Sequence, residues 1–257
     1  MQIRDKVIVI TGAGGGIGRA TSLTCASYGA KIAVMDIKKD MAEETVALIK
    51  AAGGEAISAY VDVRDRESVK AAVKKTVDAF GRIDCLFNNA GVPKPAMFLD
   101  ITDADFDFLM SVNFKGMFTV AQEVARVMKE QGSGRIVNAS SIAAIREQVG
   151  SMLYCTSKAA VAMMSKVMAA ELSEHGITTV ALCPGNVGTE FLLGSLKKHA
   201  EDEHIPYDEY LKNNAQKIPM RRMATPEEIG EIVAFLFDER SYYIDGNSLL
   251  VSGGMVM

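Results

Sequence analysis

A tyrosine and a lysine lie four residues apart near the middle of the 257-residue chain, in the run Tyr154-Cys155-Thr156-Ser157-Lys158. On a helix, this spacing places the Tyr154 phenol and the Lys158 ammonium on one face, one turn apart. A cation within a few Å favours the phenolate, so we expect the pKa of Tyr154 to lie below the ~10 of a free phenol. A tyrosine tuned in this way can exchange a proton with an alcohol, which makes it a candidate acid and base.

A serine pair, Ser140-Ser141, lies upstream of Tyr154 at the end of an apolar run, residues 135–139 (RIVNA). A short apolar run of this kind predicts a buried strand. A hydroxyl at the carboxyl end of a strand lies where open parallel sheets bind their ligands. We therefore group Ser141 with Tyr154 and Lys158 as candidate catalytic residues.

A glycine-rich turn near the amino terminus has the arrangement that binds a pyrophosphate. A β-branched run at 6–10 predicts a strand, TGAGGGIG follows it at 11–18, and helical sequence comes next. Glycines let the backbone approach the ligand, and the amide groups and dipole of the helix amino terminus attract its charge. The spacing departs from Gly-x-Gly-x-x-Gly because an isoleucine takes the place of the third glycine, and the sequence is not that of a P-loop. The candidate cofactor residues of this turn are Gly12, Gly16, Ile17 and Gly18.

The second predicted strand, residues 31–35, ends at Asp36, about eighteen residues beyond the glycine turn. A carboxylate at this place accepts hydrogen bonds from the adenosine ribose hydroxyls of NAD, and its charge repels the 2′-phosphate of NADP. Neither Gly15 nor Ile37 offers an arginine that would neutralise that phosphate, and the two lysines after Ile37 are expected to open a solvated helix. We therefore expect NAD as the cofactor.

Composition and charge narrow the classes of partner and site. A net charge of −4 and a pI near 5.5, with no basic stripe, argue against nucleic acid or an anionic membrane and favour a small-molecule substrate. Four scattered cysteines without a Cys-x-x-Cys pair indicate reduced thiols. Three histidines offer few candidate residues for a Ser-His-Asp hydrolase or a metal site, so we expect no metal. The amino terminus lacks a leader pattern and no apolar run reaches the ~20 residues of a membrane span, so we expect a cytoplasmic protein.

Strand and helix patterns alternate along the chain, which predicts β-α-β units and a parallel α/β sheet. The length suits one large domain, so we expect residues 1–257 to form a single domain. An irregular stretch, 190–217, is too long for an ordinary loop, and we expect a substrate lid at 189–218. The further predicted strands cover 55–61, 84–87, 178–182 and 248–251, and predicted helices cover 67–80, 103–131 and 226–237.

Two predicted helices, 103–131 and the one that Tyr154 opens, are apolar on more than one face. A helix that covers one face of a sheet needs a single apolar stripe. The surplus around Phe118 and Met164 predicts burial against another subunit, and thus a homo-oligomer, most simply a tetramer with two-fold axes.

Several independent motifs occur in order along the chain, namely Thr11 to Gly18, Asp62, Asn88 to Gly91, Asn113, Ser141, Tyr154 with Lys158, and Pro184 to Thr189. Through these motifs the chain resembles the short-chain dehydrogenase/reductase family over essentially its whole length. The resemblance implies a Rossmann-type, doubly wound parallel sheet of about seven strands with helices on both faces. It also implies a homotetramer whose contacts use the two apolar helices.

The resemblance also implies roles for the catalytic residues. Tyr154 would be the acid and base, and Ser141 would position and polarise the substrate oxygen. Lys158 would tune Tyr154 and bind the nicotinamide ribose, and Asn113 would hold a water in a proton relay. The remaining cofactor residues are Asp62 and Val63 at the adenine, Asn89 near the ribose with Ala90 and Gly91 beside it, and Pro184, Gly185, Val187 and Thr189 in the loop that faces the nicotinamide.

The expected activity is reversible hydride transfer between NAD(H) and a secondary alcohol or ketone, such as a polyol or a hydroxy acid. One alternative is a 3-oxoacyl thioester reductase, which would typically prefer NADP. Another is an NAD-binding sensor or structural subunit without turnover, because a fold does not by itself imply a function.

A polar cluster, Arg146-Glu147-Gln148, lies on the loop between Ser141 and Tyr154. An arginine there can bind a carboxylate, sulfonate or phosphate of the substrate with two hydrogen bonds, which makes Arg146 and Gln148 candidate substrate residues. The competing interpretation is that Arg146 points into solvent or pairs with a carboxylate.

Overall fold

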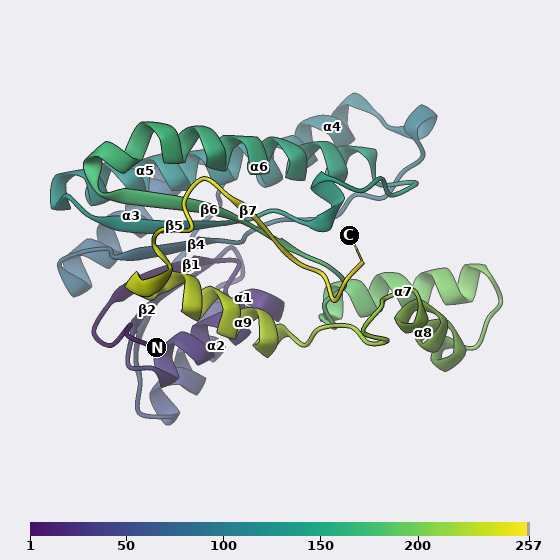
Figure 1. Cartoon of the computed structure of the whole chain (residues 1–257), viewed down its shortest axis with the longest axis horizontal. Coiled ribbons are helices and arrows are strands. Elements are labelled where there is room, and N and C mark those ends of the chain that lie inside the picture. Colours follow the sequence, from purple (N-terminus) through teal and green to yellow (C-terminus); the bar gives the residue numbers. More distant parts are fainter. Residues whose placement is uncertain (256–257) are drawn as a thin grey trace.

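The computed structural model, which describes residues 1–255, is built on one sheet of seven parallel strands (Figure 1). The strand order is β3-β2-β1-β4-β5-β6-β7, so the chain starts in the middle, runs out to β3 and crosses back to β4 beside β1. The reversal between β1 and β4 is the switch point at which such sheets bind ligands. The strands are β1 (Val7–Thr11), β2 (Lys31–Asp36), β3 (Glu55–Tyr60), β4 (Cys85–Asn88), β5 (Gly134–Ala139), β6 (Ile177–Pro184) and β7 (Ser248–Val251).

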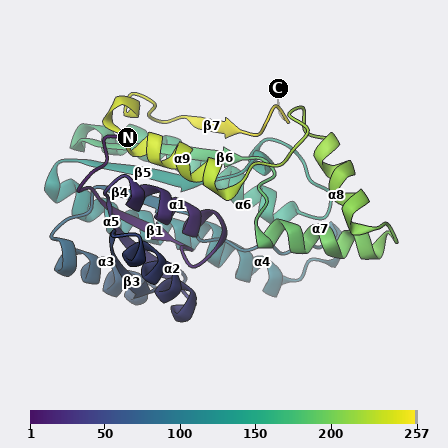
Figure 2. The same ribbon diagram turned by 90° about the horizontal axis from the view of Figure 1, so that it is seen from below.

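Helices cover both faces of the sheet, which confirms the predicted doubly wound α/β architecture. Figure 2, seen from below, shows one helical layer across the near face, and the other layer lies behind the sheet. The central strands are buried along their whole length because both faces are covered, and this explains their nearly continuous apolar sequences. One layer holds α1 (Gly16–Ser27), α2 (Lys39–Ala51) and α9 (Pro226–Phe237), and the other holds α3 (Arg66–Phe80), α4 (Asp103–Met110), α5 (Met117–Gln131) and α6 (Met152–Leu172).

The helix predicted at 103–131 begins and ends where expected, but it is not continuous. A π-helical turn, η2 (Ser111–Gly116), separates α4 from α5. The side chain of Asn113 in this turn exchanges two hydrogen bonds with the backbone of Val92, at 2.8 and 2.9 Å. A wide turn of this kind inside a helix often marks a functional site.

The stretch 190–217, which we expected to be irregular, forms two helices, α7 (Glu190–Asp202) and α8 (Tyr207–Gln216). Thr189 caps α7, since its hydroxyl accepts a hydrogen bond from the Leu192 amide at 3.3 Å, and Pro206 precedes α8. The prediction of an irregular segment was therefore wrong, because its many charged residues lie on helices. Figure 1 shows α7 and α8 extending past the carboxyl ends of the strands as an arm.

The base of this arm is tied to the loop that follows β6. Ala224 forms a short parallel bridge with Val187, in which the Ala224 amide donates to Asn186 O at 3.0 Å and the Gly188 amide donates to Ala224 O at 2.9 Å. These bonds fix both ends of the arm against the edge of the sheet.

All four cysteines have free thiols, and Cys25, Cys85 and Cys183 are buried. Within residues 1–255, no helix combines the length and the apolar character that a membrane crossing requires.

Candidate active site

The glycine turn after β1 leaves no room for side chains at two of its positions. A Cβ atom at Gly18 would lie 2.2 Å from the carbonyl oxygen of Gly12, so the first turn of α1 packs directly on the loop. Gly12 has a φ of +63°, and a Cβ atom there would lie 3.1 Å from the Cα atom of Ala90. The cap residue of α1 is Gly15, which has no side chain to occupy the amide groups of the first turn. These bare amides form a cradle that fits the pyrophosphate of a dinucleotide.

Two carboxylates border this turn at the ends of neighbouring strands. Asp36, at the end of β2, accepts hydrogen bonds from the amides of Gly14 and Lys38, both at 2.9 Å, which fix its carboxylate beside the glycines. Asp62 follows β3 and accepts two side-chain hydrogen bonds from Arg64, at 2.9 and 2.6 Å. These bonds hold the pKa of Asp62 below its usual value, so it is ionised at neutral pH.

Val63 is the next residue along the chain, and it is buried. A Cβ atom at Gly116, the last residue of the π-helical turn, would lie 2.7 Å from a Val63 methyl group. The glycine thus lets the start of α5 approach the loop after β3 closely. This contact joins the predicted adenine end of the site to the turn that carries Asn113.

The loop after β4 connects the glycine turn with the candidate catalytic residues. The Thr11 hydroxyl accepts hydrogen bonds from the amides of Asn89 and Ala90, at 2.9 and 3.1 Å, which bind this loop to the end of β1. A Cβ atom at Gly91 would lie 3.4 Å from Asn113 Oδ1 and 3.6 Å from Lys158 Nζ. A side chain at this position would therefore contact both predicted catalytic side chains, and the glycine leaves that space free.

Lys158 is buried below the mouth of the site. Its ammonium donates a hydrogen bond to the carbonyl of Ala139 at 2.7 Å and lies 5.5 Å from the centre of the Tyr154 ring. The backbone around it is held by Ser140, whose hydroxyl donates to Lys158 O at 2.8 Å. Burial disfavours the ammonium and lowers the pKa of Lys158 to about 8, so most of it remains charged at neutral pH.

The expected lowering of the Tyr154 pKa is not found in this structure. Burial raises the pKa of the Tyr154 phenol, and a hydrogen bond with Ser141 opposes that rise only in part. The physical reason is that Lys158 directs its ammonium to a backbone carbonyl, while the phenol is desolvated. In the protein alone, Tyr154 is therefore a protonated phenol at neutral pH, which is the form that donates a proton.

The other two candidate catalytic residues are fixed by backbone groups. Ser141 ends the strand segment and caps the short helix η3 (Ile142–Ala144), where its hydroxyl accepts from the Ala143 amide at 3.1 Å. Asn113 reaches the catalytic helix through buried Ser157, which donates to Tyr154 O at 2.8 Å and lies 3.5 Å from Asn113 Nδ2. The Asn113 side chain is thus hydrogen-bonded to Val92 and Ser157. Its predicted role in holding a water stays a prediction.

The loop after β6 closes the other side of the site. The Gly185 amide, just beyond Pro184, donates to Val251 O at 2.8 Å, and Val187 is buried. A Cβ atom at Gly16 would lie 3.4 Å from the Thr189 methyl group, so the loop faces the glycine turn directly. Residues from the ends of β1, β2, β4, β5 and β6 therefore meet along one edge of the sheet.

Arg146 and Gln148 are exposed on the loop between η3 and α6. The Arg146 amide donates to Ile142 O at 2.9 Å, but within residues 1–255 its guanidinium forms no ion pair.

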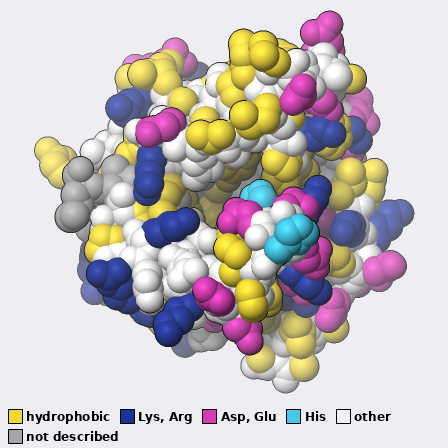
Figure 3. Space-filling model, turned by 90° about the vertical axis from the view of Figure 1, so that its right-hand side faces the viewer, with side chains coloured by type: hydrophobic (Ala, Val, Ile, Leu, Met, Phe, Trp, Pro, Cys, Tyr) yellow, Lys and Arg dark blue, Asp and Glu magenta, His cyan; other side chains and the backbone are white. Residues whose placement is uncertain are grey.

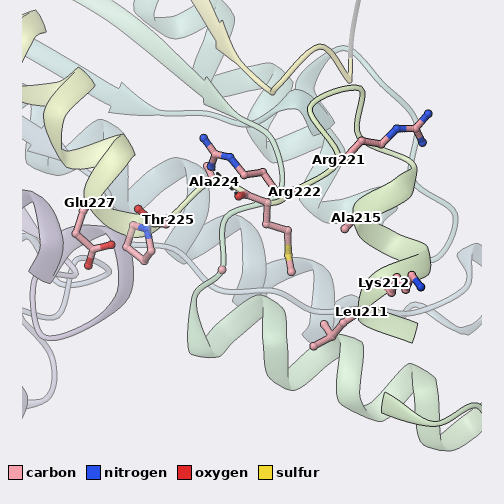
Figure 4. A pocket seen from close by; sticks show the side chains of 11 residues that line it. Leu211, Lys212, Ala215, Arg221, Arg222, Ala224, Thr225 and Glu227 are labelled. Atoms are coloured by element: carbon pink, nitrogen blue, oxygen red, sulfur yellow. Dashed lines mark hydrogen bonds between the residues drawn. The ribbon is translucent and has the colours of Figure 1, made fainter. Parts of the chain in front are cut away.

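A separate hollow of about 590 Å³ lies between α8 and the segment before α9 (Figure 4). It shares Gly188 with the loop after β6, but Ser141, Tyr154 and Lys158 do not line it. We therefore centre the site on the tyrosine and lysine, where the titratable groups converge. Sequence reasoning did not identify Val92, Gly116 or Ser157 as members of this site, and only the last of these, inside the Tyr154 to Lys158 run, carried a local signal.

Comparison with known proteins finds matches to a protein family and to its members over most of the chain. The family model described as short chain dehydrogenase matches residues 6–199. An uncharacterized oxidoreductase of Thermotoga maritima is 38% identical over 99% of this chain and 98% of its own length. The 3-oxoacyl-(acyl-carrier-protein) reductase of the same organism is 35% identical over 100% of both chains.

Solved structures have the same fold as this protein over nearly the whole chain. The crystal structure of levodione reductase has a TM-score of 0.93 and 32% identity, with 98% of both chains covered. A variant of actinorhodin polyketide ketoreductase, solved with NADPH, has a TM-score of 0.94 and 29% identity, with 98% of this chain and 97% of the other covered.

Proposed function

We propose that this chain, which belongs to the short-chain dehydrogenase family, is an enzyme that transfers a hydride reversibly between NAD(H) and a secondary alcohol or ketone. The observation that carries the proposal is the meeting of Ser141, Tyr154 and Lys158 at the carboxyl edge of the sheet, opposite the glycine turn. Intact acid, base and positioning groups at a dinucleotide cradle also argue against a sensor without turnover.

The nicotinamide supplies the hydride acceptor or donor when it is bound, and the protein supplies proton transfer and orientation. Tyr154 gives a proton to the ketone oxygen, or takes one from the alcohol. Its raised pKa keeps the phenol protonated at neutral pH, which is the state that ketone reduction needs. Ser141, which hydrogen-bonds with the phenol, holds the substrate oxygen on the same side.

Lys158 holds the nicotinamide ribose and keeps a positive charge near Tyr154 as the phenol loses its proton. This role is supported by the position of its ammonium, which would lie 3.6 Å from a Cβ atom at Gly91, so the glycine keeps the loop after β4 free of a side chain beside the ammonium. Asn113 fixes the same loop through Val92 and holds a water of the proton relay. The cofactor as a whole is held by Gly12, Gly16, Ile17, Gly18, Asp36, Asp62, Val63, Asn89, Ala90, Gly91, Pro184, Gly185, Val187 and Thr189, together with Tyr154 and Lys158.

Asp36 selects NAD over NADP. Its carboxylate is held beside the glycine turn by two amides, where it accepts from the ribose hydroxyls and repels a 2′-phosphate. The related ketoreductase solved with NADPH indicates that the fold alone does not select NAD, so the cofactor proposal rests on Asp36.

The cofactor assignment is tested by measuring kcat/KM with both cofactors for the wild type and for Asp36→Ala. We expect the wild type to favour NAD, and the variant to lose activity with NAD and gain activity with NADP. The control is Asp40→Ala, which removes an exposed carboxylate in the first turn of α2 and should keep the wild-type preference. A wild type with higher kcat/KM for NADP would contradict the assignment.

The arm of residues 189–218 acts as a lid over the substrate, and the chain assembles into a homotetramer. The lid is supported by the position of α7 and α8 beyond the strand ends, with both ends of the arm tied to the sheet edge. The assembly is supported by Phe118, Met163 and Val167, apolar side chains that α5 and α6 leave exposed.

A 3-oxoacyl thioester reductase is the second candidate function, and the 35% identity to such a reductase over both full lengths favours it. A panel of polyols, hydroxy acids, hydroxysteroids and acyl thioesters, followed by the absorbance of NADH and NADPH, separates the two. The first candidate predicts the highest kcat/KM for an alcohol or ketone with NAD(H). If the best substrate carries an anionic group, Arg146 and Gln148 are its binding residues, and a neutral best substrate leaves them as surface residues.

A further inference from the structure

We infer that the substrate has a sizeable apolar body, which rests on a rim of exposed hydrophobic side chains at the mouth of the site. This inference rests on the proposed function and narrows its substrates from polyols and short hydroxy acids to alcohols and ketones with an apolar body. The rim consists of Met97, Phe98, Leu99, Val149 and Met152, which come from two segments of the chain.

Both segments start among the catalytic residues. The first begins at Gly91, where a Cβ atom would lie 3.4 Å from Asn113 Oδ1 and 3.6 Å from Lys158 Nζ, and its next residue, Val92, is hydrogen-bonded to the Asn113 side chain. The second runs from Ser141 to Tyr154, so it joins the two groups that hold the substrate oxygen. A substrate whose oxygen lies between Ser141 and Tyr154 therefore extends outward between these segments.

The two segments meet again at the surface. The Ala96 amide donates to Gly150 O at 2.9 Å, and Ala96 forms a parallel bridge with Ser151, the residue that precedes α6. A Cβ atom at Gly150 would lie 3.9 Å from the Met97 sulfur, so the Met97 side chain lies on the second segment. These contacts hold the two segments side by side at the surface, and the rim residues lie on their outer ends.

This surface is strongly exposed and apolar. Leu99 is 92% exposed, Val149 is 87% exposed and Phe98 is 66% exposed. The cation of the first segment, Lys94, is paired with Asp105 at 2.9 Å, so it offers the substrate no free charge. Figure 3 shows hydrophobic side chains gathered above a hollow on the face at the carboxyl ends of the strands. A continuous apolar patch at the mouth of a catalytic site indicates contact with a ligand.

The probes are cyclohexanone and its 4-methyl, 4-ethyl, 4-propyl and 4-butyl derivatives, which share one carbonyl and differ in apolar length. Each methylene that the rim covers should raise kcat/KM by about fourfold. The dissociation constants of the matching cyclohexanols, measured by calorimetry with NADH so that no hydride transfer occurs, should fall in parallel. The double variant Phe98→Asn with Val149→Asn should reduce the rise to less than about twofold per methylene. Tyr243→Asn, which replaces a fully exposed aromatic residue outside the rim, is the control and should keep the wild-type slope.

A flat series in the wild type, or an equal slope in the double variant, would overturn the inference. So would a double variant that lost oligomer mass by light scattering while it kept the slope, because the rim would then be a subunit contact. If the cyclohexanols bound with the predicted slope but no ketone was reduced, the rim would stand and the proposed function would fail. If cyclohexanone was reduced but affinity did not change with length, the proposed function would stand and the rim would fail.

Discussion

Replacing Lys158 by methionine would remove the charge of a lysine that is only 3% exposed, while an unbranched side chain still fills the space. The ammonium has one hydrogen bond, to Ala139 O at 2.7 Å, and desolvation lowers its pKa from the ordinary 10.5 to about 8. The wild type thus holds this charge at a cost in stability, which Lys158→Met should relieve.

The sign and size of the effect follow from the two pKa values. A pKa lowered from 10.5 to about 8 corresponds to a cost of about 3 kcal/mol at pH 7, where the lysine is charged in both the folded and the unfolded chain. As the pH rises through 8, the folded protein releases the proton and the unfolded chain keeps it, so the stability of the wild type rises. Between pH 7 and 9.5 this gain amounts to about 2 kcal/mol. Lys158→Met lacks this titration. The lost hydrogen bond destabilises the variant by about 1–3 kcal/mol at every pH, an offset that opposes the relief of the desolvation cost.

The assay is urea unfolding of the cofactor-free proteins at pH 7, 8 and 9.5. The readout is how the difference in unfolding free energy between wild type and variant changes with pH. The offset from the lost hydrogen bond and the effects of the other titrating groups largely cancel in this change. Lys166→Met, an exposed lysine on the same helix, is the matched control. A difference between wild type and Lys158→Met that was the same at pH 7 and 9.5 would refute the reasoning.

The remaining predictions concern the cofactor cradle and the assembly. Gly18→Ala should weaken NADH binding at least about tenfold and lower stability, because the new methyl group would meet Gly12 O at 2.2 Å. The control, Gly194→Ala, has open space around it on α7 and should be neutral or stabilising by up to about 1 kcal/mol. Equal NADH affinity in both variants would count against the cradle. Light scattering at micromolar concentration should give the mass of a tetramer for the wild type and a smaller mass for Met163→Glu, and a wild-type monomer would exclude the assembly.

The fold and the centre of the site were predictable because their signals are local or follow from topology. The glycine turn directly follows an apolar run, and Asp36 ends the next one, so both fall at the same edge of a parallel sheet. The spacing of Tyr154 and Lys158 places both on one helix, and Ser141 lies two residues beyond the end of the strand before it.

The rest depends on packing that no local pattern records. Burial, rather than the neighbouring charge, sets the direction of the Tyr154 pKa, and burial is known only once the chain is folded. The π-helical turn joins Asn113 to Val92, twenty-one residues earlier in the sequence. The first helix of the arm, α7, did carry a local signal, a cap at Thr189, but the density of charged residues concealed it.

The most direct test of the proposed chemistry is the steady-state activity of Tyr154→Phe together with its affinity for NADH. The ring still packs when only the hydroxyl is removed, so NADH affinity should stay within about twofold of the wild type, while kcat should fall at least ~100-fold through loss of the proton donor. A variant that bound NADH normally and kept kcat within about tenfold of the wild type would contradict the assignment of Tyr154 as the acid and base.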